Sequence, residues 1–424
     1  MRLALSIVFL ASIARADPID LLGYGPRGAA MGSAFTALSD DASAAMYNPA
    51  GSSLADRASV LLGYGAGRMA LDLDGNDAGL TDPGGFSFAV GVPFRVLGAA
   101  MGAAIALYLP DQFVARLRVM PGDQPRFVLL DNDVDRIVFN PTLSLRLCRW
   151  LAIGGGVTLL ANAAGNGITF DLESKGGQAQ GASALDVELP TRAAPIAGVL
   201  VLPTERLRLG ASWRGAIDLR LRIDVVSEAD FGGIVEGDSI ISVRAVNLYT
   251  PQRVSAGAAF AARESLTLTA DLTYLRWSDY EGDVVDLQTL VDLSTAPPLV
   301  LASVPRQRFR DVWVPRVGAE HLRRHSERLR SAWRAGAYYE RSPVPDQTGL
   351  TSFADNDRVV ATLGAGVTWG PGTILLAPTS LDATLQLHQL VPRETRKDDV
   401  AGPTGDFSSG GRIYHGSIMW TVRF

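Results

Sequence analysis

Residues 206–225 separate into an apolar and a polar face with a period of two, and this pattern limits the folds open to the chain. Odd positions, from Leu207 to Val225, are almost all apolar, whereas even positions carry mostly arginine, serine or aspartate. Such alternation is typical of an extended strand. At ~3.3 Å per residue the strand would measure about 60 Å, far longer than usual in a soluble protein. The pattern therefore favours a tall β-barrel that projects beyond a membrane.

The same alternation recurs along the rest of the chain, for example in residues 266–274, 381–388 and 135–150. In the last of these, Cys148 falls on the polar face, which we expect to line the lumen. Turn-forming residues separate the alternating segments. We predict about fourteen strands, an even number as bacterial single-chain barrels prefer. They cover residues 57–71, 84–94, 98–109, 134–149, 151–170, 192–202, 206–226, 238–260, 264–277, 308–321, 328–341, 356–369, 379–391 and 411–424.

The composition agrees with an all-β transmembrane barrel. The chain is 47% hydrophobic, yet after residue 16 no apolar run reaches the roughly 20 residues that a membrane-spanning helix requires. Apolar residues interleaved with polar ones suit strands that meet lipid outside and a lumen inside. The net charge of -5 argues against a general nucleic-acid binder. The single cysteine cannot form an intramolecular disulfide.

The first residues read as a secretory signal peptide. Arg2 provides the basic start, residues 3–13 the apolar run, and residues 14–16 (ARA) a small-x-small cleavage site. We therefore exclude residues 1–16 from the fold. The alternative is an amphipathic helix that stays attached, but the hydrophilic pair Asp17 and Pro18 follows at once.

The C-terminal residues have the pattern of a final amphipathic strand. Apolar and polar residues alternate from 414 to the final residue, Phe424, which is in phase with the apolar face. Such a strand is similar to the signal that the outer-membrane assembly machinery recognises. A soluble sandwich could also end on a strand, so this alternative stays open.

Residues 17–56 have no strand pattern and are rich in Gly and Ala. Short helices that begin near Ser39 or Asp40 are plausible there. A fourteen-stranded lumen without a filling would be an aqueous channel. We therefore expect residues 17–56 to be a plug, or hatch, inside a barrel formed by residues 57–424; an exposed periplasmic tail is the alternative.

Several short blocks carry a family resemblance. They are residues 28–35 (GAAMGSAF), 40–43 (DDAS), 48–50 (NPA), 271–278 (DLTYLRWS), 309–313 (FRDVW), 334–346 (RAGAYYERSPVPD) and 355–358 (DNDR). Through these blocks the chain resembles the FadL-type outer-membrane transport proteins, which are channels for long-chain fatty acids and aromatic hydrocarbons. The blocks occur in the family's order and span nearly all of the mature chain.

The resemblance implies a hatch in the lumen and a gate. It places Asn48, Pro49 and Ala50 against an inward kink in the third strand. That kink should lie in residues 98–109, where Gly98 and Gly102 remove side chains that would resist it. No ligand-contacting side chain of the family could be matched.

The implied function is passive uptake of a hydrophobic molecule, with a long-chain fatty acid as the first expectation, by binding in the lumen and lateral release through the wall. Alternating inward-facing arginines could attract a carboxylate. The alternative, which we favour, is that they pair with lumenal Asp and Glu. These candidates are Arg206, Arg208, Arg214, Arg220 and Arg222.

No enzymatic or metal site is expected. His321 and His325 are spaced i,i+4, but they lie at a strand-to-turn transition, so we interpret them as ordinary polar residues. The nearest approach to the hydrolase motif Gly-x-Ser-x-Gly is residues 210–214 (GASWR), which lacks the last glycine. No Walker-type phosphate loop and no cofactor motif is found.

Two other barrel functions remain open at this stage. One is a secretion or assembly accessory barrel that binds protein partners at its loops; the other is a general porin. The expected partners of the favoured reading are a fatty acid or aromatic hydrocarbon, outer-membrane lipid and lipopolysaccharide, and the assembly machinery through Phe424. We expect a monomer integral to the outer membrane of a Gram-negative cell.

Overall fold

The computed structural model describes residues 21–424, apart from 112–114, 119–124, 131–132, 135–136, 162–167, 172–182, 186–190, 231–235, 281–287, 294–295, 300–307, 348–350 and 398–404. The predicted signal peptide, residues 1–16, lies outside the described residues. Within them, no helix is long and apolar enough to cross a membrane.

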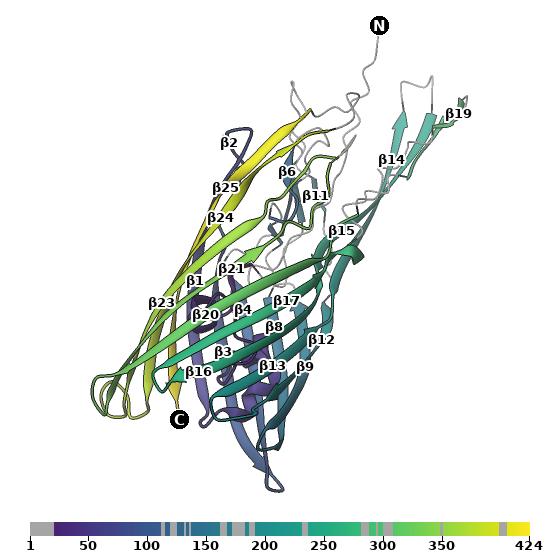
Figure 1. Cartoon of the computed structure of the whole chain (residues 1–424). Helices are drawn as coiled ribbons and strands as arrows, with labels where there is room; N and C mark the ends of the chain where they lie inside the picture. The colour runs from purple at the N-terminus through teal and green to yellow at the C-terminus, as the bar shows by residue number, and fades with distance from the viewer. Residues whose placement is uncertain are drawn as a thin grey trace.

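The fold is a closed antiparallel barrel of fourteen strands (Figure 1). Each strand pairs with its neighbours in the barrel, and pairing of β1 with β3 closes the ring. The barrel strands are β1 (Ser59–Leu73), β3 (Gly84–Val96), β4 (Ala99–Pro110), β8 (Ile137–Cys148), β9 (Leu151–Ala161), β12 (Arg192–Val201), β13 (Leu207–Arg214), β16 (Gln252–Arg263), β17 (Leu266–Arg276), β20 (Val312–Arg324), β21 (Leu329–Glu340), β23 (Arg358–Trp369), β24 (Thr379–Thr395) and β25 (Phe407–Arg423). The predicted fold class is confirmed.

Side chains on the strands alternate as the sequence predicts. On β24, Leu385 is 69% exposed, whereas its neighbour Thr384 is 2% exposed. On β25, Trp420 is 44% exposed and Thr421 is 5% exposed. The apolar face therefore points away from the barrel axis, and the polar face points into the lumen. This inverted arrangement is what a barrel surrounded by hydrocarbon requires.

Three predicted strands are wrong in extent. Residues 206–226 divide at Gly215, and residues 238–260 divide at Pro251, a residue that cannot donate to a strand ladder. The outer halves, β14 (Ile217–Asp230) and β15 (Glu236–Thr250), form a separate sheet with β18 (Gln288–Leu293) and β19 (Ala296–Leu299). Residues 151–170 also end early, at Ala161. The alternating pattern does not reveal these breaks, because the chain is extended on both sides of each break.

The two ends of the barrel differ. Short turns, such as Leu97 with Gly98, join the strands at the end where the C-terminus lies (Figure 1). The opposite end, which we call the mouth, carries the long connections. They contain the short elements β2 (Asn76–Asp77), β5 (Ala115–Arg118), β6 (Arg126–Phe127), β7 (Asp133–Val134), β10 (Ile168–Asp171), β11 (Ser183–Leu185), η2 (Trp277–Asp279) and β22 (Phe353–Ala354).

Three tyrosines on strands that border the mouth each donate a hydrogen bond from the hydroxyl to an aspartate. Tyr339 is 37% exposed on β21, next to the lipid-facing surface. An aromatic ring with a bonded polar tip suits the boundary between hydrocarbon and headgroups. The pairs are Tyr64 with Asp111, Tyr274 with Asp311, and Tyr339 with Asp357.

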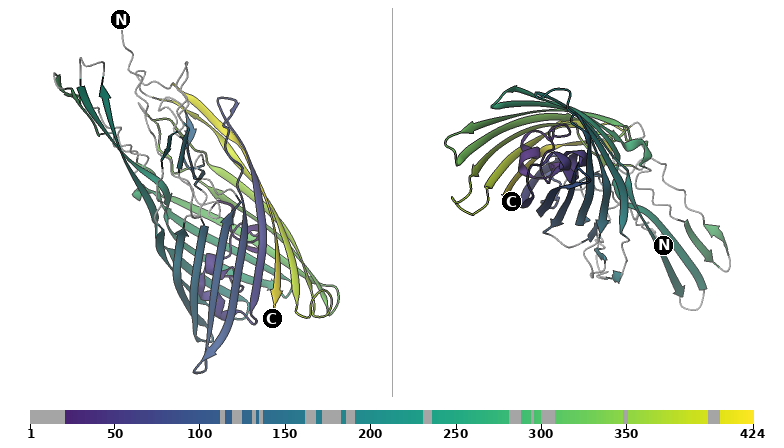
Figure 2. Two further views of the ribbon diagram at one scale, coloured as in Figure 1. Left: turned by 180° about the vertical axis from the view of Figure 1, so that it is seen from behind. Right: turned by 90° about the horizontal axis from the view of Figure 1, so that it is seen from below.

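The described part of the N-terminal segment, residues 21–54, lies inside the ring of strands (Figure 2). It consists of two short helices, α2 (Pro26–Ala30) and α3 (Ala44–Tyr47), and a 3-10 helix, η1 (Pro49–Leu54). The helices contact strands on opposite sides of the barrel: α2 lies against β23 and β24, and η1 against β4, β8, β9 and β12. We refer to residues 21–54 as the inner segment.

Candidate functional site

Glycine, proline and asparagine residues let the inner segment turn tightly enough to fit inside the barrel. Gly23 and Gly25 have positive φ values of 80° and 68°, which L residues rarely adopt. Pro26 then occupies the first turn of α2, where its missing N–H costs nothing. Before η1, Asn48 accepts a hydrogen bond from the Ala50 N–H through its own side chain. The expectation of a helix capped by Ser39 or Asp40 is not met, because α3 begins at Ala44.

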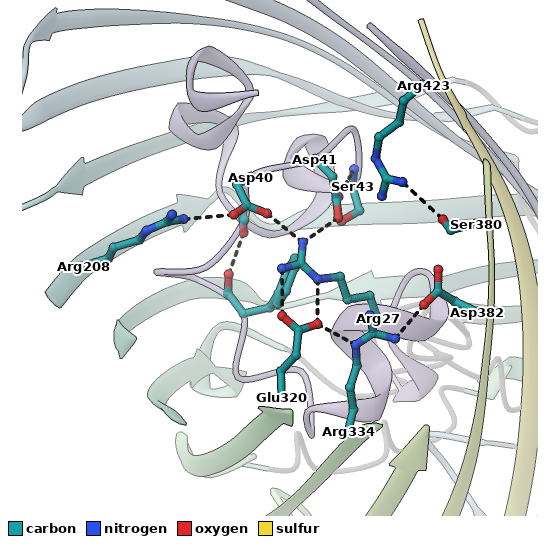
Figure 3. A network of polar contacts seen from close by, with 12 residues as sticks. Arg27, Asp40, Asp41, Ser43, Arg208, Glu320, Arg334, Ser380, Asp382 and Arg423 are labelled. Carbon is teal, nitrogen blue, oxygen red and sulfur yellow. Dashed lines mark hydrogen bonds and ion pairs between the residues drawn. The ribbon is translucent and has the colours of Figure 1, made fainter. Parts of the chain in front are cut away.

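Arg27 is the centre of an ion-pair network that joins the inner segment to the wall (Figure 3). Its guanidinium lies 2.7 Å from Asp40 and 3.1 Å from Asp41 within the segment, and 3.1 Å from Glu320 on β20. Glu320 also pairs with Arg334 at 2.7 Å. The network thus connects α2 to the strands by several charge-assisted hydrogen bonds.

The network extends to two further strands. Arg334 on β21 pairs with Asp382 on β24 at 2.6 Å, and Arg208 on β13 pairs with Asp40 at 3.0 Å. Burial alone would raise the pKa of Asp40, but Arg27 and Arg208 outweigh it and hold that pKa below its ordinary value. Asp40 is therefore a carboxylate at neutral pH, and it binds the segment to β13.

Glycines in the wall let the inner segment lie directly on the strands. A Cβ added to Gly154 on β9 would meet the Ala50 nitrogen at 2.4 Å. At Gly198 on β12 it would meet Asn48 Oδ1 at 2.0 Å. Contacts this short do not occur between real atoms, so only glycine fits at these positions. Six further strand glycines face the inner segment within 3.0 Å: Gly91, Gly102, Gly210, Gly318, Gly336 and Gly364.

Asn48 fixes η1 against β12. It is fully buried, and its Nδ2 donates to the Thr36 carbonyl at 2.9 Å and to the Val199 carbonyl at 3.1 Å. Both amide hydrogens and the side-chain oxygen of Asn48 are therefore used. The bond to the Val199 carbonyl ties this corner of the segment to the wall.

A cavity, the mouth cavity, lies between the inner segment and the loops at the mouth. Its apolar lining comes from Leu21, Leu129, Leu130, Leu275 and Trp277. Its charged lining comes from Arg253, Arg358 and Glu340, the last two of which pair at 2.8 Å. Trp277 also belongs to a cluster of buried aromatic rings that includes Tyr249, Tyr280, Phe309 and Phe353.

Two further cavities flank the same inner segment. One, the arginine cavity, is lined by Arg214, Arg253 and Arg316 together with segment residues such as Tyr47. The other, the glycine cavity, lies between residues 22–26 and the wall at β1, β3 and β25. Residues 21–25 border all three cavities, so this short stretch separates the mouth from the lower lumen.

The predicted gate lies at a different part of the wall than expected. Asn48, Pro49 and Ala50 face β9 and β12, the fifth and sixth barrel strands, whereas Ser52 is the residue that faces Gly102 on the third. Gly98 is not a strand residue: it lies in the β3–β4 turn with φ 84°. β4 itself pairs with both neighbours without a register shift. The family resemblance identified the motif of Asn48, Pro49 and Ala50, but not the strands that it faces.

The five candidate arginines do not form one site. Arg208 pairs with Asp40, which agrees with the favoured pairing role, and Arg214 is buried beside the arginine cavity. Arg206 is exposed in the turn that precedes β13. Arg220 and Arg222 belong to β14, which is not a barrel strand, and their side chains lie outside the described residues.

The other residues singled out in the sequence are His321, His325 and Cys148. His321 and His325 have exposed side chains, and His325 bonds to Ser331 across a turn. Among the described residues no three potential metal ligands cluster together. Cys148 is half-buried at the end of β8. Sequence reasoning missed Arg27, Glu320 and the Trp277 cavity, although Trp277 lies in one of the matching blocks.

The comparisons agree with this architecture. The family model described as outer membrane protein transport protein (OMPP1/FadL/TodX) matches residues 7–387. A comparison with curated protein sequences gave no match.

Solved structures resemble the chain over nearly its whole length. A Pseudomonas aeruginosa FadL homologue is 16% identical with a TM-score of 0.57, and the match covers 99% of both chains. The Pseudomonas putida toluene transporter TodX is 16% identical with a TM-score of 0.57, over 96% of this chain and 99% of that one. The Ralstonia pickettii toluene transporter TbuX is 18% identical with a TM-score of 0.52, over 96% of this chain and 100% of that one. This chain therefore belongs to the OMPP1/FadL/TodX family of outer membrane transport proteins and is an integral outer-membrane β-barrel.

Proposed function

We propose that this protein is a passive channel that carries hydrophobic small molecules through the lumen and releases them sideways through the barrel wall. The mouth cavity is the observation that carries the proposal. It is largely apolar, it lies beneath the mouth loops, and residues 21–25 stand between it and the lower lumen. In family members the mouth faces outward, because barrel strands have short periplasmic turns and longer extracellular loops.

Burial of apolar surface provides the driving force for capture. A ligand that loses about 200 Å² of apolar surface on entering the barrel gains roughly 5 kcal/mol, at about 25 cal/mol per Å². Water-filled pores offer no such gain. Transport then needs no energy source and follows the concentration gradient.

The inner segment is the hatch of this channel, and Asn48, Pro49 and Ala50 are its gate. The strand pairing in the wall beside them is incomplete. The ladder between β8 and β9 is interrupted at Asn140 and Pro141, and β9 carries three consecutive glycines, Gly154 to Gly156. When η1 moves away from this strip, the gap in the ladder and the missing side chains of the three glycines leave the wall less completely closed. We propose this strip, rather than Gly98 and β4, as the lateral exit.

Long-chain fatty acids are the first cargo to test. The buried arginines beneath the mouth suit a carboxylate head group better than a plain hydrocarbon. Aromatic hydrocarbons are the second cargo, because TodX and TbuX are described as toluene transporters. We propose no enzymatic activity, and we propose that the barrel works as a monomer whose C-terminal Phe424 is recognised by the assembly machinery.

Uptake measurements test the proposal. Cells that lack the gene, and the same cells complemented with it, are given a labelled long-chain fatty acid or an alkylbenzene. We expect uptake to be restored by the gene, to scale with the external concentration, and to persist without metabolic energy. Unchanged uptake of both compounds, together with a defect in protein secretion, would instead support an accessory barrel. Steady ion conductance of the purified protein in planar bilayers would support a general porin.

A further inference from the structure

The turn between β20 and β21 is rich in arginine. Residues 323–330, which we call the basic turn, contain four arginines and one carboxylate, Glu327. All four arginine side chains are exposed, and within the described part of the chain none of them forms an ion pair. Arg324 Nε donates to the Ser326 carbonyl of its own turn at 3.3 Å. The four arginines are Arg323, Arg324, Arg328 and Arg330.

The fold places two of these arginines directly opposite each other. Arg324 and Arg330 are cross-strand partners in the ladder of β20 with β21, and like charges in this position repel. The neighbouring turn, between β16 and β17, adds no net negative charge, because its one carboxylate, Glu264, follows Arg263. An anion bound beside the basic turn would therefore relieve a repulsion that the described residues leave uncompensated.

An apolar turn lies directly beside the basic turn. Residues 370–378, between β23 and β24, contain no charged residue and are called the apolar turn below. The Gly370 N–H donates to the Arg328 carbonyl at 2.7 Å, so the two turns are in contact. Leu376 is 95% exposed and Ile374 is 55% exposed. Large apolar side chains that are exposed together mark an interaction surface.

Both turns lie where the barrel leaves the hydrocarbon, at the end where the C-terminus lies (Figure 1). Trp333, which is 59% exposed on the lipid-facing surface, pairs with His321, two positions before Arg323. Leu381 is 40% exposed on β24, three positions after Pro378. Both turns therefore begin within about 10 Å of lipid-facing side chains along a tilted strand, which places them in or next to the headgroup layer.

We propose that the basic turn and the apolar turn form a binding site for an anionic phospholipid of the periplasmic leaflet. Short turns of outer-membrane barrels face the periplasm, and the leaflet on that side contains phospholipid. The phosphate binds between Arg323 and Arg328, because guanidinium groups pair with phosphate oxygens through two hydrogen bonds. Ile374 and Leu376 contact the apolar part of the same lipid.

Two features favour a lipid over an acidic protein as the occupant. The surface continues the lipid-facing wall without a break, as the exposed Trp333 and Leu381 show. It also combines positive charge with exposed apolar side chains, which is the combination that holds proteins to anionic membranes. The site is separate from the proposed lateral exit, because its strands do not border β8 or β9.

Lipid binding by the full chain in a neutral detergent tests the proposal. Native mass spectrometry measures the affinity for phosphatidylglycerol and for phosphatidylcholine with the same acyl chains. We expect the parent to bind phosphatidylglycerol at least about tenfold more tightly, since each arginine near an anionic lipid contributes roughly fivefold. In the triple variant Arg323→Gln, Arg324→Gln, Arg328→Gln this preference should fall below about threefold.

Two further variants complete the test. The matched control removes the same number of charges from three separate turns at the same end of the barrel, and it should keep the preference. Leu376→Ser should weaken both lipids to the same extent, because it removes an apolar contact that they share. The control carries three substitutions of exposed residues: Arg95→Gln, Arg149→Gln and Arg263→Gln.

The outcomes distinguish a lipid site from its alternatives. Equal affinities of the parent for the two lipids would overturn the proposal. An equal loss of preference in the control variant would also overturn it, because net charge alone would then explain the binding. If the parent shows no lipid preference but binds a glutamate-rich peptide, the basic turn is a protein-docking surface instead. A loss of preference confined to the variant of the basic turn supports the lipid site.

Discussion

Arg27 and Glu320 form a two-contact ion pair across 293 residues of sequence. Arg27 Nε lies 3.1 Å from Glu320 Oε2, and Arg27 Nη2 lies 3.1 Å from Oε1. This planar arrangement fixes the orientation of the guanidinium as well as its position. The second face of the same guanidinium reaches Asp40 and Asp41. One side chain thus holds the inner segment in shape and attaches it to β20.

Replacing Arg27 with Met should loosen the inner segment. Glu320, Asp40 and Asp41 would lose their shared cation, and breaking a buried pair costs about 3 kcal/mol or more. We expect faster hydrogen exchange in residues 21–54 with little change in the strands, measured by mass spectrometry. Arg310→Met is the control, because the pair of Arg310 with Asp346 is exposed and contributes little. Equal exchange in the two variants would contradict a central role for Arg27.

Gly154→Val and Gly155→Val form a matched pair on adjacent residues of β9. A side chain at Gly154 would overlap the backbone of Pro49 and Ala50, whereas the nearest atom to one at Gly155 is the Ile196 carbonyl oxygen at 3.4 Å. We expect Gly154→Val to displace η1, lower stability by about 1–3 kcal/mol and raise ion conductance in planar bilayers. Gly155→Val should stay near the parent. If both variants conduct alike, η1 does not close the lumen.

Asn48→Ala should release the corner of the segment that meets β12. The carbonyls of Thr36 and Val199 would lose their donor. Leaving buried polar groups without a partner should destabilise the folded protein by about 1–3 kcal/mol. We expect the rate of cargo uptake to rise at low ligand concentration, because the proposed gate opens more readily. Asn76→Ala, which removes one exposed hydrogen bond, serves as the control. An uptake rate equal to that of the parent would exclude Asn48 from the gate.

Asp355 in the mouth loops makes stability depend on pH. Burial raises the pKa of Asp355 to about 6, against an ordinary value of 3.8. Because the folded-state pKa is raised, the neutral acid is the favoured form. This stabilising contribution is complete below pH 3.8 and is lost as the pH rises through about 6. Relative to the parent, Asp355→Asn should therefore stabilise the protein more at pH 7.5 than at pH 5.

Thermal unfolding of the full chain in detergent at the two pH values checks this prediction. The difference in stability between Asp355→Asn and the parent should grow by roughly 1.4 kcal/mol from pH 5 to pH 7.5, because the parent loses this stability over only about one pH unit between pH 5 and the folded-state pKa of about 6. Asp346→Asn, an exposed residue of the same loop, should show no such growth. A constant difference at both pH values would mean that Asp355 stays charged in the folded protein.

The alternating pattern predicted the barrel because successive residues of a membrane-spanning strand face lipid and lumen in turn. It placed Leu385 outward and Thr384 inward without any knowledge of neighbouring strands. It could not place the bends at Gly215 and Pro251, since the pattern continues on both sides of a bend. The family resemblance located Asn48, Pro49 and Ala50, but not the strands that they face.

The sequence by itself determined the class of the protein: a hydrophobic surface outside, a polar lumen inside, and a segment before the first strand that cannot join the sheet. Only the tertiary structure decided how these parts act together. Arg27 meets Glu320, Gly154 meets Ala50, and Trp277 and Leu21 line one cavity, because closure of the barrel brings together residues separated by up to about three hundred positions. Local periodicity reflects a residue's immediate surroundings, whereas such pairings depend on the register of every strand between them.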